Sequence, residues 1–105
     1  MIKVEIEYKG TKLQSLKVKG HANSGPYGKD MVCAAVTIML TGAANALENE
    51  AENFDVTLEE GLALFEPKSA ISEHDQTVLE TLILQLKTLE VSPATKGTLT
   101  IKERK

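Results

Sequence analysis

Apolar and polar side chains alternate along the start of the chain. Every second residue from 2 to 8 is apolar or aromatic, with lysine or glutamate between them, and this period of two is that of a strand with one buried face. Residues 16–19 alternate in the same way, so a turn over residues 9–12 would join the two strands in a hairpin. Leu13 is out of phase with Leu16, which predicts either a late start of the second strand or a β-bulge.

A helical spacing follows. Between residues 31 and 50 the apolar side chains recur every three or four positions, the spacing of one helix face. They are Val32, Val36, Met39, Leu40, Ala43 and Leu47. The pattern predicts a helix from about Met31 to about Glu50. Asp30 is a plausible N-cap, because its carboxylate can accept backbone N–H groups of the first turn.

The second half of the chain repeats these patterns. Alternation over residues 54–59 and a return over residues 62–65 predict a second hairpin that ends before Pro67. A helix is predicted over residues 72–89, where a serine begins a capping signature and apolar residues form a helical stripe. A last short strand is predicted over residues 98–102.

The element order is therefore ββαββαβ, without an internal linker or repeat. Paired strands with helices between them predict an α+β fold, a two-layer sandwich in which two helices cover one side of a largely antiparallel sheet. The 105 residues are enough for one domain and not two, so we expect residues 1–105 to form a single domain.

Charge and cysteine content narrow the function. The net charge of −3 argues against direct nucleic-acid binding. A single cysteine cannot form an internal disulfide, and a free thiol fits a reducing compartment. The N-terminus lacks the apolar stretch of a signal peptide, and no run of residues approaches the length of a membrane span. We therefore expect a cytoplasmic protein that binds no membrane.

The candidate chemistry lies in residues 20–35, which hold the only cysteine and one of the two histidines. If Asp30 caps the helix, Cys33 falls in the first turn, where unpaired N–H groups and the helix dipole favour a thiolate and could hold an oxyanion. His21, at the end of the second strand, is a candidate base for this nucleophile. Thr37, one turn beyond the cysteine, could donate a hydrogen bond into the site.

Each of these residues also has an ordinary structural interpretation. A lone cysteine on an apolar helix is commonly a core residue, Asp30 can serve only as a cap, and Thr37 can bond to its own backbone. His74 fits a solvated surface residue. One cysteine and two histidines match none of the familiar zinc spacings, so no metal site is expected. The glycine-rich loop lacks the Lys-Ser/Thr ending of a phosphate loop.

Two segments change this balance: Gly20-His21-Ala22, and Gly28-Lys29-Asp30-Met31-Val32-Cys33-Ala34-Ala35-Val36. They resemble the signature of the bacterial ribosomal-processing cysteine protease family (Prp), and the resemblance extends over the chain in length and element order. Members of that family remove a short N-terminal extension from a large-subunit ribosomal protein. The resemblance implies that His21 and Cys33 are the catalytic dyad and that Asp30 belongs to the same site. The family often has serine where this chain has Thr37.

The resemblance also implies a homodimer, and a mobile loop between the dyad residues that covers the substrate. Gly25 and Gly28 give this loop conformational freedom, and Tyr27 is a candidate wall of the substrate pocket. We therefore expect a cysteine endopeptidase without a cofactor, in which the thiolate of Cys33 attacks a peptide carbonyl and His21 moves the proton. Two alternatives stay open: a non-catalytic, ribosome-associated peptide-binding module, and a thiol redox sensor.

Overall fold

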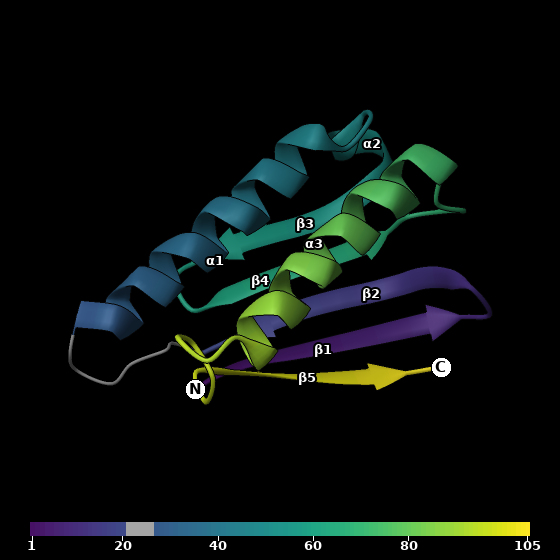
Figure 1. Ribbon diagram of the computed structural model, residues 1–105. Coiled ribbons are helices and arrows are strands. Elements are labelled where there is room, and N and C mark those ends of the chain that lie inside the picture. The colour runs from purple at the N-terminus through teal and green to yellow at the C-terminus, as the bar shows by residue number, and fades with distance from the viewer. Residues whose placement is uncertain (21–26) are drawn as a thin grey trace.

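The computed structural model describes residues 1–20 and 27–105, without the side chains of residues 27–30 (Figure 1). Five strands form one sheet in the order β3-β4-β2-β1-β5. They are β1 (Ile2–Lys9), β2 (Lys12–Lys19), β3 (Phe54–Glu59), β4 (Leu62–Pro67) and β5 (Leu99–Arg104). Only β1 and β5 are parallel among the described neighbours. The predicted, largely antiparallel sheet is therefore confirmed.

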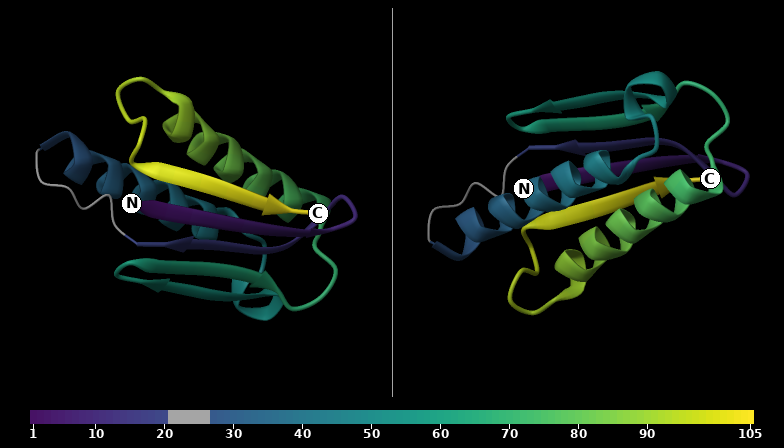
Figure 2. Two further views of the ribbon diagram at one scale, coloured as in Figure 1. Left: turned by 90° about the horizontal axis from the view of Figure 1, so that it is seen from below. Right: turned by 90° about the horizontal axis from the view of Figure 1, so that it is seen from above.

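Two long helices, α1 (Tyr27–Ala46) and α3 (Glu73–Val91), cover one face of this sheet. Figure 2 shows the strands in front of the helices from below and the helices in front of the strands from above. The predicted two-layer α+β sandwich is confirmed. The short helix α2 (Glu50–Asn53) before β3 was not predicted. No helix in the described part of the chain is long and apolar enough to cross a membrane.

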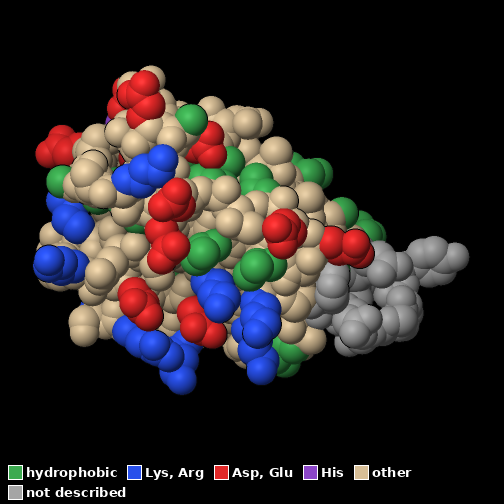
Figure 3. Space-filling model, turned by 180° about the vertical axis from the view of Figure 1, so that it is seen from behind, with side chains coloured by type: hydrophobic (Ala, Val, Ile, Leu, Met, Phe, Trp, Pro, Cys, Tyr) green, Lys and Arg blue, Asp and Glu red, His purple; other side chains and the backbone are tan. Residues whose placement is uncertain are grey.

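The core lies between the helices and one face of the sheet. In β1 its members are Ile2, Val4 and Ile6, each no more than 2% exposed. The opposite face of the sheet carries charges in register, with Glu5 opposite both Lys17 on β2 and Lys102 on β5. Figure 3 shows acidic and basic side chains interspersed on this side of the molecule. The sheet is thus apolar toward the helices and charged toward solvent, as the alternation predicted.

A β-bulge resolves the phase shift at the start of β2. The pairing passes from Glu7 opposite Ser15 to Tyr8 opposite Leu13, so that β2 contains one extra residue. The bulge turns Leu13 into the core, and its backbone N–H donates to Oε1 of Gln76 at 3.0 Å. The alternative that predicted a bulge is confirmed, and β2 starts early rather than late.

The first helix has different ends from those predicted. It begins at Tyr27 rather than near Met31, and it ends at Ala46 rather than near Glu50. Asp30 therefore lies in the first turn and is not the N-cap, so that prediction is wrong. An aspartate in the first turn is still favourable, because the positive end of the helix dipole attracts it. After α1 the chain turns through Asn49 in the left-handed conformation, with φ of 46°.

Candidate active site

Cys33 lies on the wall of a cavity of about 590 Å³. It is half-buried and packs against the core from the second turn of α1. The cavity is bounded by one side of α1, by the start of β1 and the end of β2, and by the turn between β3 and β4. From α1 it receives Cys33, Val36, Thr37, Leu40 and Thr41. Residues four apart on a helix lie on one face, which is why the cysteine and both threonines share this wall.

Thr37 is held within its own helix. Its Oγ1 donates a hydrogen bond to the carbonyl oxygen of Cys33 at 2.8 Å. A hydroxyl has one proton to donate, so this proton is engaged by the helix backbone and is not donated into the cavity. Thr37 therefore lies beside the candidate nucleophile, and its hydroxyl bonds to its own helix backbone. This is the second of the two interpretations that the sequence allowed.

The early start of α1 changes the chemistry expected at Cys33. The backbone N–H groups without a helical partner belong to the first turn, at residues 27–30. Cys33 lies six residues after Tyr27, or about 9 Å along the axis at about 1.5 Å per residue. The dipole effect fades beyond the first turn. The prediction that Cys33 lies in the first turn, where unpaired N–H groups could hold an oxyanion, is therefore wrong.

The opposite wall of the cavity comes from the β3–β4 hairpin, which sequence reasoning did not connect with the site. The backbone N–H of Gly20 donates to the carbonyl of Gly61 at 2.9 Å, and both residues line the cavity. Glu59 and Glu60, just before Gly61, also line it. The alternation of apolar and polar residues predicted this hairpin, but it did not predict which strand the hairpin pairs with. Because β4 pairs with β2, the turn reaches the end of the strand that precedes His21.

The remaining predicted site residues lie at the margin of the described structure. His21 and Gly25 lie outside the described residues. The backbones of Tyr27 and Gly28 belong to the first turn of α1, so the prediction that the cover loop extends to residue 29 is wrong for residues 27–29. The rest of that loop, residues 22–26, lies outside the described part of the chain.

A second group of titratable side chains joins the end of α1 to the start of α3. Nδ1 of His74 lies 2.9 Å from Oδ1 of Asp75 and 3.5 Å from Oε1 of Glu48. The hydrogen bond to Asp75 raises the pKa of His74. Buried Asp75 also accepts the backbone N–H of Glu48 at 3.0 Å. Donor atoms of all three residues lie within 4.8 Å of one another, but one ring nitrogen facing two carboxylates is the arrangement of an ion pair. None of the three lines the Cys33 cavity.

Ser72 caps α3 as predicted, since its side chain accepts the backbone N–H of Asp75 at 3.1 Å. The predicted surface position of His74 also agrees with the structure, since half of its side chain is exposed.

Comparison with known proteins identifies a family of the same fold. The family model described as "Cysteine protease Prp" matches residues 1–96. The ribosomal processing cysteine protease Prp of Staphylococcus aureus is 32% identical over 82 residues, covering 75% of this chain and 77% of the relative. That of Bacillus subtilis is 36% identical over 83 residues, covering 72% and 74%.

Solved structures extend the likeness over the whole chain. An essential ribosomal processing protease Prp from S. aureus, crystallised with a covalently linked product peptide, has a TM-score of 0.83 at 25% identity and covers 99% of this chain and 100% of its own. The structure of SMU.848 from Streptococcus mutans has a TM-score of 0.77 at 28% identity and covers 99% and 97%.

Proposed function

Because this chain belongs to the cysteine protease Prp family and is a ribosomal-processing cysteine protease, we propose that it removes the N-terminal extension of a large-subunit ribosomal protein, with Cys33 as nucleophile and His21 as general base and acid. Such a substrate places the enzyme in the cytoplasm. The relative from S. aureus has been crystallised with a covalently linked product peptide, which is what a nucleophilic mechanism leaves when its second step does not finish.

The position of Cys33 is the observation that carries the assignment. It is the only cysteine of the chain, and it lines a cavity of about 590 Å³ between α1 and the β3–β4 hairpin. Gly20, which precedes His21 in the sequence, lines the same cavity. The position of His21 in the sequence, next to a residue of the cavity wall, supports its choice as the partner of Cys33.

The reaction then proceeds in two steps. His21 takes the proton from Sγ of Cys33, the sulfur forms a bond to the peptide carbonyl carbon, and the C–N bond breaks as the imidazolium returns the proton to the leaving amine. Water next attacks the thioester, and its proton passes through His21 back to the sulfur. This step releases the carboxyl end of the removed extension. No cofactor takes part.

The residues around the dyad complete the proposal. Asp30, three positions before Cys33 in α1, orients His21. Gly25, Tyr27 and Gly28 contribute to substrate binding. Thr37 supports Cys33 through the helix backbone.

Incubating the purified protein with the extended ribosomal protein, followed by mass spectrometry, tests this function. A single specific cut supports the protease. Binding without a cut would instead identify a peptide-binding module, and oxidation of Cys33 without a cut would identify a redox sensor. His21→Ala should remove most activity and raise the pH at which iodoacetamide labels Cys33. Identical labelling profiles in the two proteins would mean that His21 does not act on the thiol.

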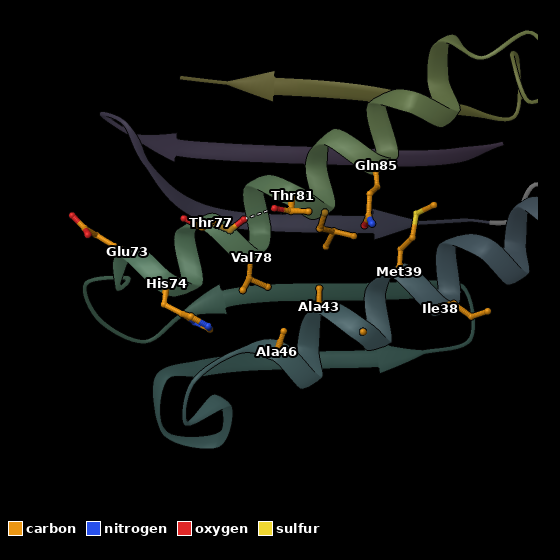
Figure 4. Close-up of a pocket in the computed structure, with 12 residues that line it drawn as sticks. Ile38, Met39, Ala43, Ala46, Glu73, His74, Thr77, Val78, Thr81 and Gln85 are labelled. Atoms are coloured by element: carbon orange, nitrogen blue, oxygen red, sulfur yellow. Dashed lines mark hydrogen bonds between the residues drawn. The ribbon is translucent and has the colours of Figure 1, made fainter.

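The exposed side of the helical layer supports a homodimer. Residues 31–47, most of α1, contain no charged side chain, in a chain that is 26% charged. Ile38 on α1 and Leu84 on α3 are 72% and 63% exposed. Between the helices lies a groove of about 690 Å³ in which the small residues Gly42, Ala43 and Ala46 form one side. Figure 4 shows Ala43 and Val78 facing one another across this groove.

A second copy fits this face better than a charged partner. Each copy brings the uncharged segment of α1, with its exposed apolar side chains, beside a groove that has small residues on its α1 side and Glu73 and His74 among its α3 residues. The same patch can therefore serve both sides of a two-fold contact. The helices have 20 and 19 residues, about 30 Å at about 1.5 Å per residue. Two such helices side by side, each about 10 Å wide with its side chains, cover about 600 Å², somewhat below the ~800 Å² per partner of a standard interface.

Light scattering after gel filtration tests the dimer. Ile38→Glu should shift the protein to monomer, because it brings a carboxylate into the apolar part of the interface. Thr100→Glu, on the exposed outer side of β5, is the matched control and should stay dimeric. A wild-type monomer, or a dimer that tolerates Ile38→Glu, would contradict the assignment of this face.

A further inference from the structure

A threonine hydroxyl on the wall of the Cys33 cavity has no hydrogen-bond partner among the described residues. It belongs to Thr41 on α1, which lines the cavity and is exposed. The exposed threonines Thr37, Thr81 and Thr88 each donate to the carbonyl four residues earlier in their helix, whereas Thr41 makes no such bond. Thr41 therefore keeps a hydroxyl proton that a molecule in the cavity can accept.

The phase of α1 places Thr41 on the cavity side of the helix. Thr41 follows Cys33 by about two turns and lies about 80° further round the helix axis, at about 100° per residue. The residues of α1 that line the groove toward α3 include Met39, Gly42 and Ala46, and they lie about 100–160° from Thr41 around the axis. Thr41 is thus at the solvent rim of the Cys33 cavity, on the side of α1 that faces away from α3.

Most of the remaining side chains of this wall offer a peptide no hydrogen bond. They are aliphatic, namely Ile2, Val18, Val36, Leu40, Leu58, Leu62 and Ala63. Main-chain groups of a peptide that lies against such a surface lose water, and each group left without a partner weakens binding. A hydroxyl can donate one hydrogen bond and accept two, so Thr41 can bond to either a carbonyl or an N–H group of the peptide.

The distance along α1 determines which part of a peptide Thr41 can reach. Cys33 and Thr41 are eight positions apart in the helix, or about 12 Å along the axis at ~1.5 Å per residue. An extended peptide advances about 3.3–3.6 Å per residue, so this distance corresponds to roughly three or four of its residues. A peptide that runs along α1 with its scissile carbonyl at Cys33 therefore brings a more distant residue beside Thr41.

We propose that Thr41 is a substrate-binding residue, whose hydroxyl bonds to the main chain of the peptide about three or four residues from the scissile bond. This inference rests on the protease function proposed above. A bond so far from the reacting atoms strengthens the binding of substrate and transition state alike. A neutral hydrogen bond changes binding by about 2- to 10-fold, so Thr41→Val should raise KM by that factor and leave kcat within about 2-fold of the wild type.

A test that needs no cleavage measures the affinity for an uncut peptide. The probe is a synthetic peptide that covers the N-terminal extension and the first residues after it, and calorimetry gives its Kd for the Cys33→Ala protein. Adding Thr41→Val should raise this Kd about 2- to 10-fold. Thr41→Ser keeps the hydroxyl and should leave the Kd within about 2-fold.

Thr88→Val is the matched control. Thr88 is an exposed threonine on α3 that does not line the cavity, so its replacement in the Cys33→Ala protein makes the same chemical change elsewhere. It should leave the Kd unchanged. A Kd that rises as much in Thr88→Val as in Thr41→Val would overturn the proposal.

Shortening the peptide locates the contact. The peptide is trimmed one residue at a time from each end, and the Kd with Thr41→Val is divided by the Kd without it. This ratio should fall to one when the residue beside Thr41 is removed, roughly the third or fourth from the scissile bond on one side. Trimming from the other end should leave the ratio unchanged.

The outcomes separate this inference from the protease function. Equal Kd values with and without Thr41→Val, an equal loss in Thr41→Ser, or a ratio that survives every truncation would overturn the proposal, and cleavage by the wild type would still support the protease. Failure of the wild type to cut the extended ribosomal protein would contradict the protease function, and the calorimetric comparison would still decide whether Thr41 contacts a bound peptide. A peptide that is neither bound nor cut would overturn both.

Discussion

Gly20→Ala tests how the end of β2 is fixed beside the cavity. Gly20 has a φ of +95°, and a Cβ there would lie 2.7 Å from the carbonyl oxygen of Met1. A left-handed conformation costs a non-glycine residue about 1–2 kcal/mol, and relieving an overlap with backbone costs about a further 1–3 kcal/mol. We therefore expect a loss of about 2–5 kcal/mol in the free energy of unfolding, which a domain with ~5–15 kcal/mol of stability can survive.

Gly97→Ala separates these two costs. Gly97 has a φ of +90°, and a Cβ there would meet no atom within 4 Å, so this substitution carries the conformational cost without the contact. Gly20→Ala should be less stable than Gly97→Ala by about 1–3 kcal/mol, or about 5–20 °C in melting temperature at ~4–8 °C per kcal/mol. Calorimetry of the two variants measures this difference.

The Gly20→Ala substitution should also slow catalysis. Shifting Met1 moves its neighbour Ile2, which lines the cavity together with Gly20. A displacement of about 1 Å near reacting groups can cost ~100-fold, so kcat of folded Gly20→Ala should fall about 10- to 100-fold, with Gly97→Ala near the wild type. Equal melting temperatures and equal kcat in the two variants would refute the reasoning about this contact.

Two further predictions concern His74 and Thr37. Because a hydrogen bond to the neighbouring carboxylate raises the pKa of His74 above 6.5, the protonated ring stabilises the folded state below that pH, and its contribution is lost as pH rises through the folded pKa. Denaturant titrations should therefore show a larger loss for His74→Gln at about pH 5.5 than at about pH 8.5, and equal losses would contradict the ion pair. Thr37→Val removes only the hydrogen bond to the backbone of Cys33, so cleavage should stay within about 3-fold of the wild type; a loss beyond ~100-fold would place the hydroxyl in the reaction.

Much of the fold could be predicted because the spacing of the apolar residues identifies each helix or strand, and their positions show which of its faces is buried. The alternation in residues 2–8 and the phase shift at Leu13 predicted β1 and offered the bulge as one explanation, since both follow from which side chains reach the core. Sheet order was not accessible in this way. The parallel pairing of β5 with β1 joins the two ends of the chain, and local pattern holds no information on such a contact.

The start of α1 was predicted wrongly because Gly28 and Asp30 are residue types that also occur in loops and at helix N-caps. Gly28 and Asp30 were interpreted as a loop residue and an N-cap, but both lie in the first helical turn. Glycine there costs about 1 kcal/mol relative to alanine, and an aspartate in that turn gains from the helix dipole. The candidate nucleophile could be identified from the sequence because cysteine is unique in the chain. The β3–β4 hairpin beside it was missed, because its place depends on the pairing of β4 with β2.

The most direct test of the account is the mass of the enzyme during turnover. Rapid acid quenching of a reaction with the extended ribosomal protein, followed by digestion, should yield the peptide that contains Cys33 with the removed extension attached as a thioester. Cys33→Ser should remain folded, show no such adduct, and lose several orders of magnitude in rate, as is usual for a lost nucleophile. Cleavage by Cys33→Ser at nearly the wild-type rate, or an acyl group attached to another residue, would contradict the assignment of Cys33 as the nucleophile.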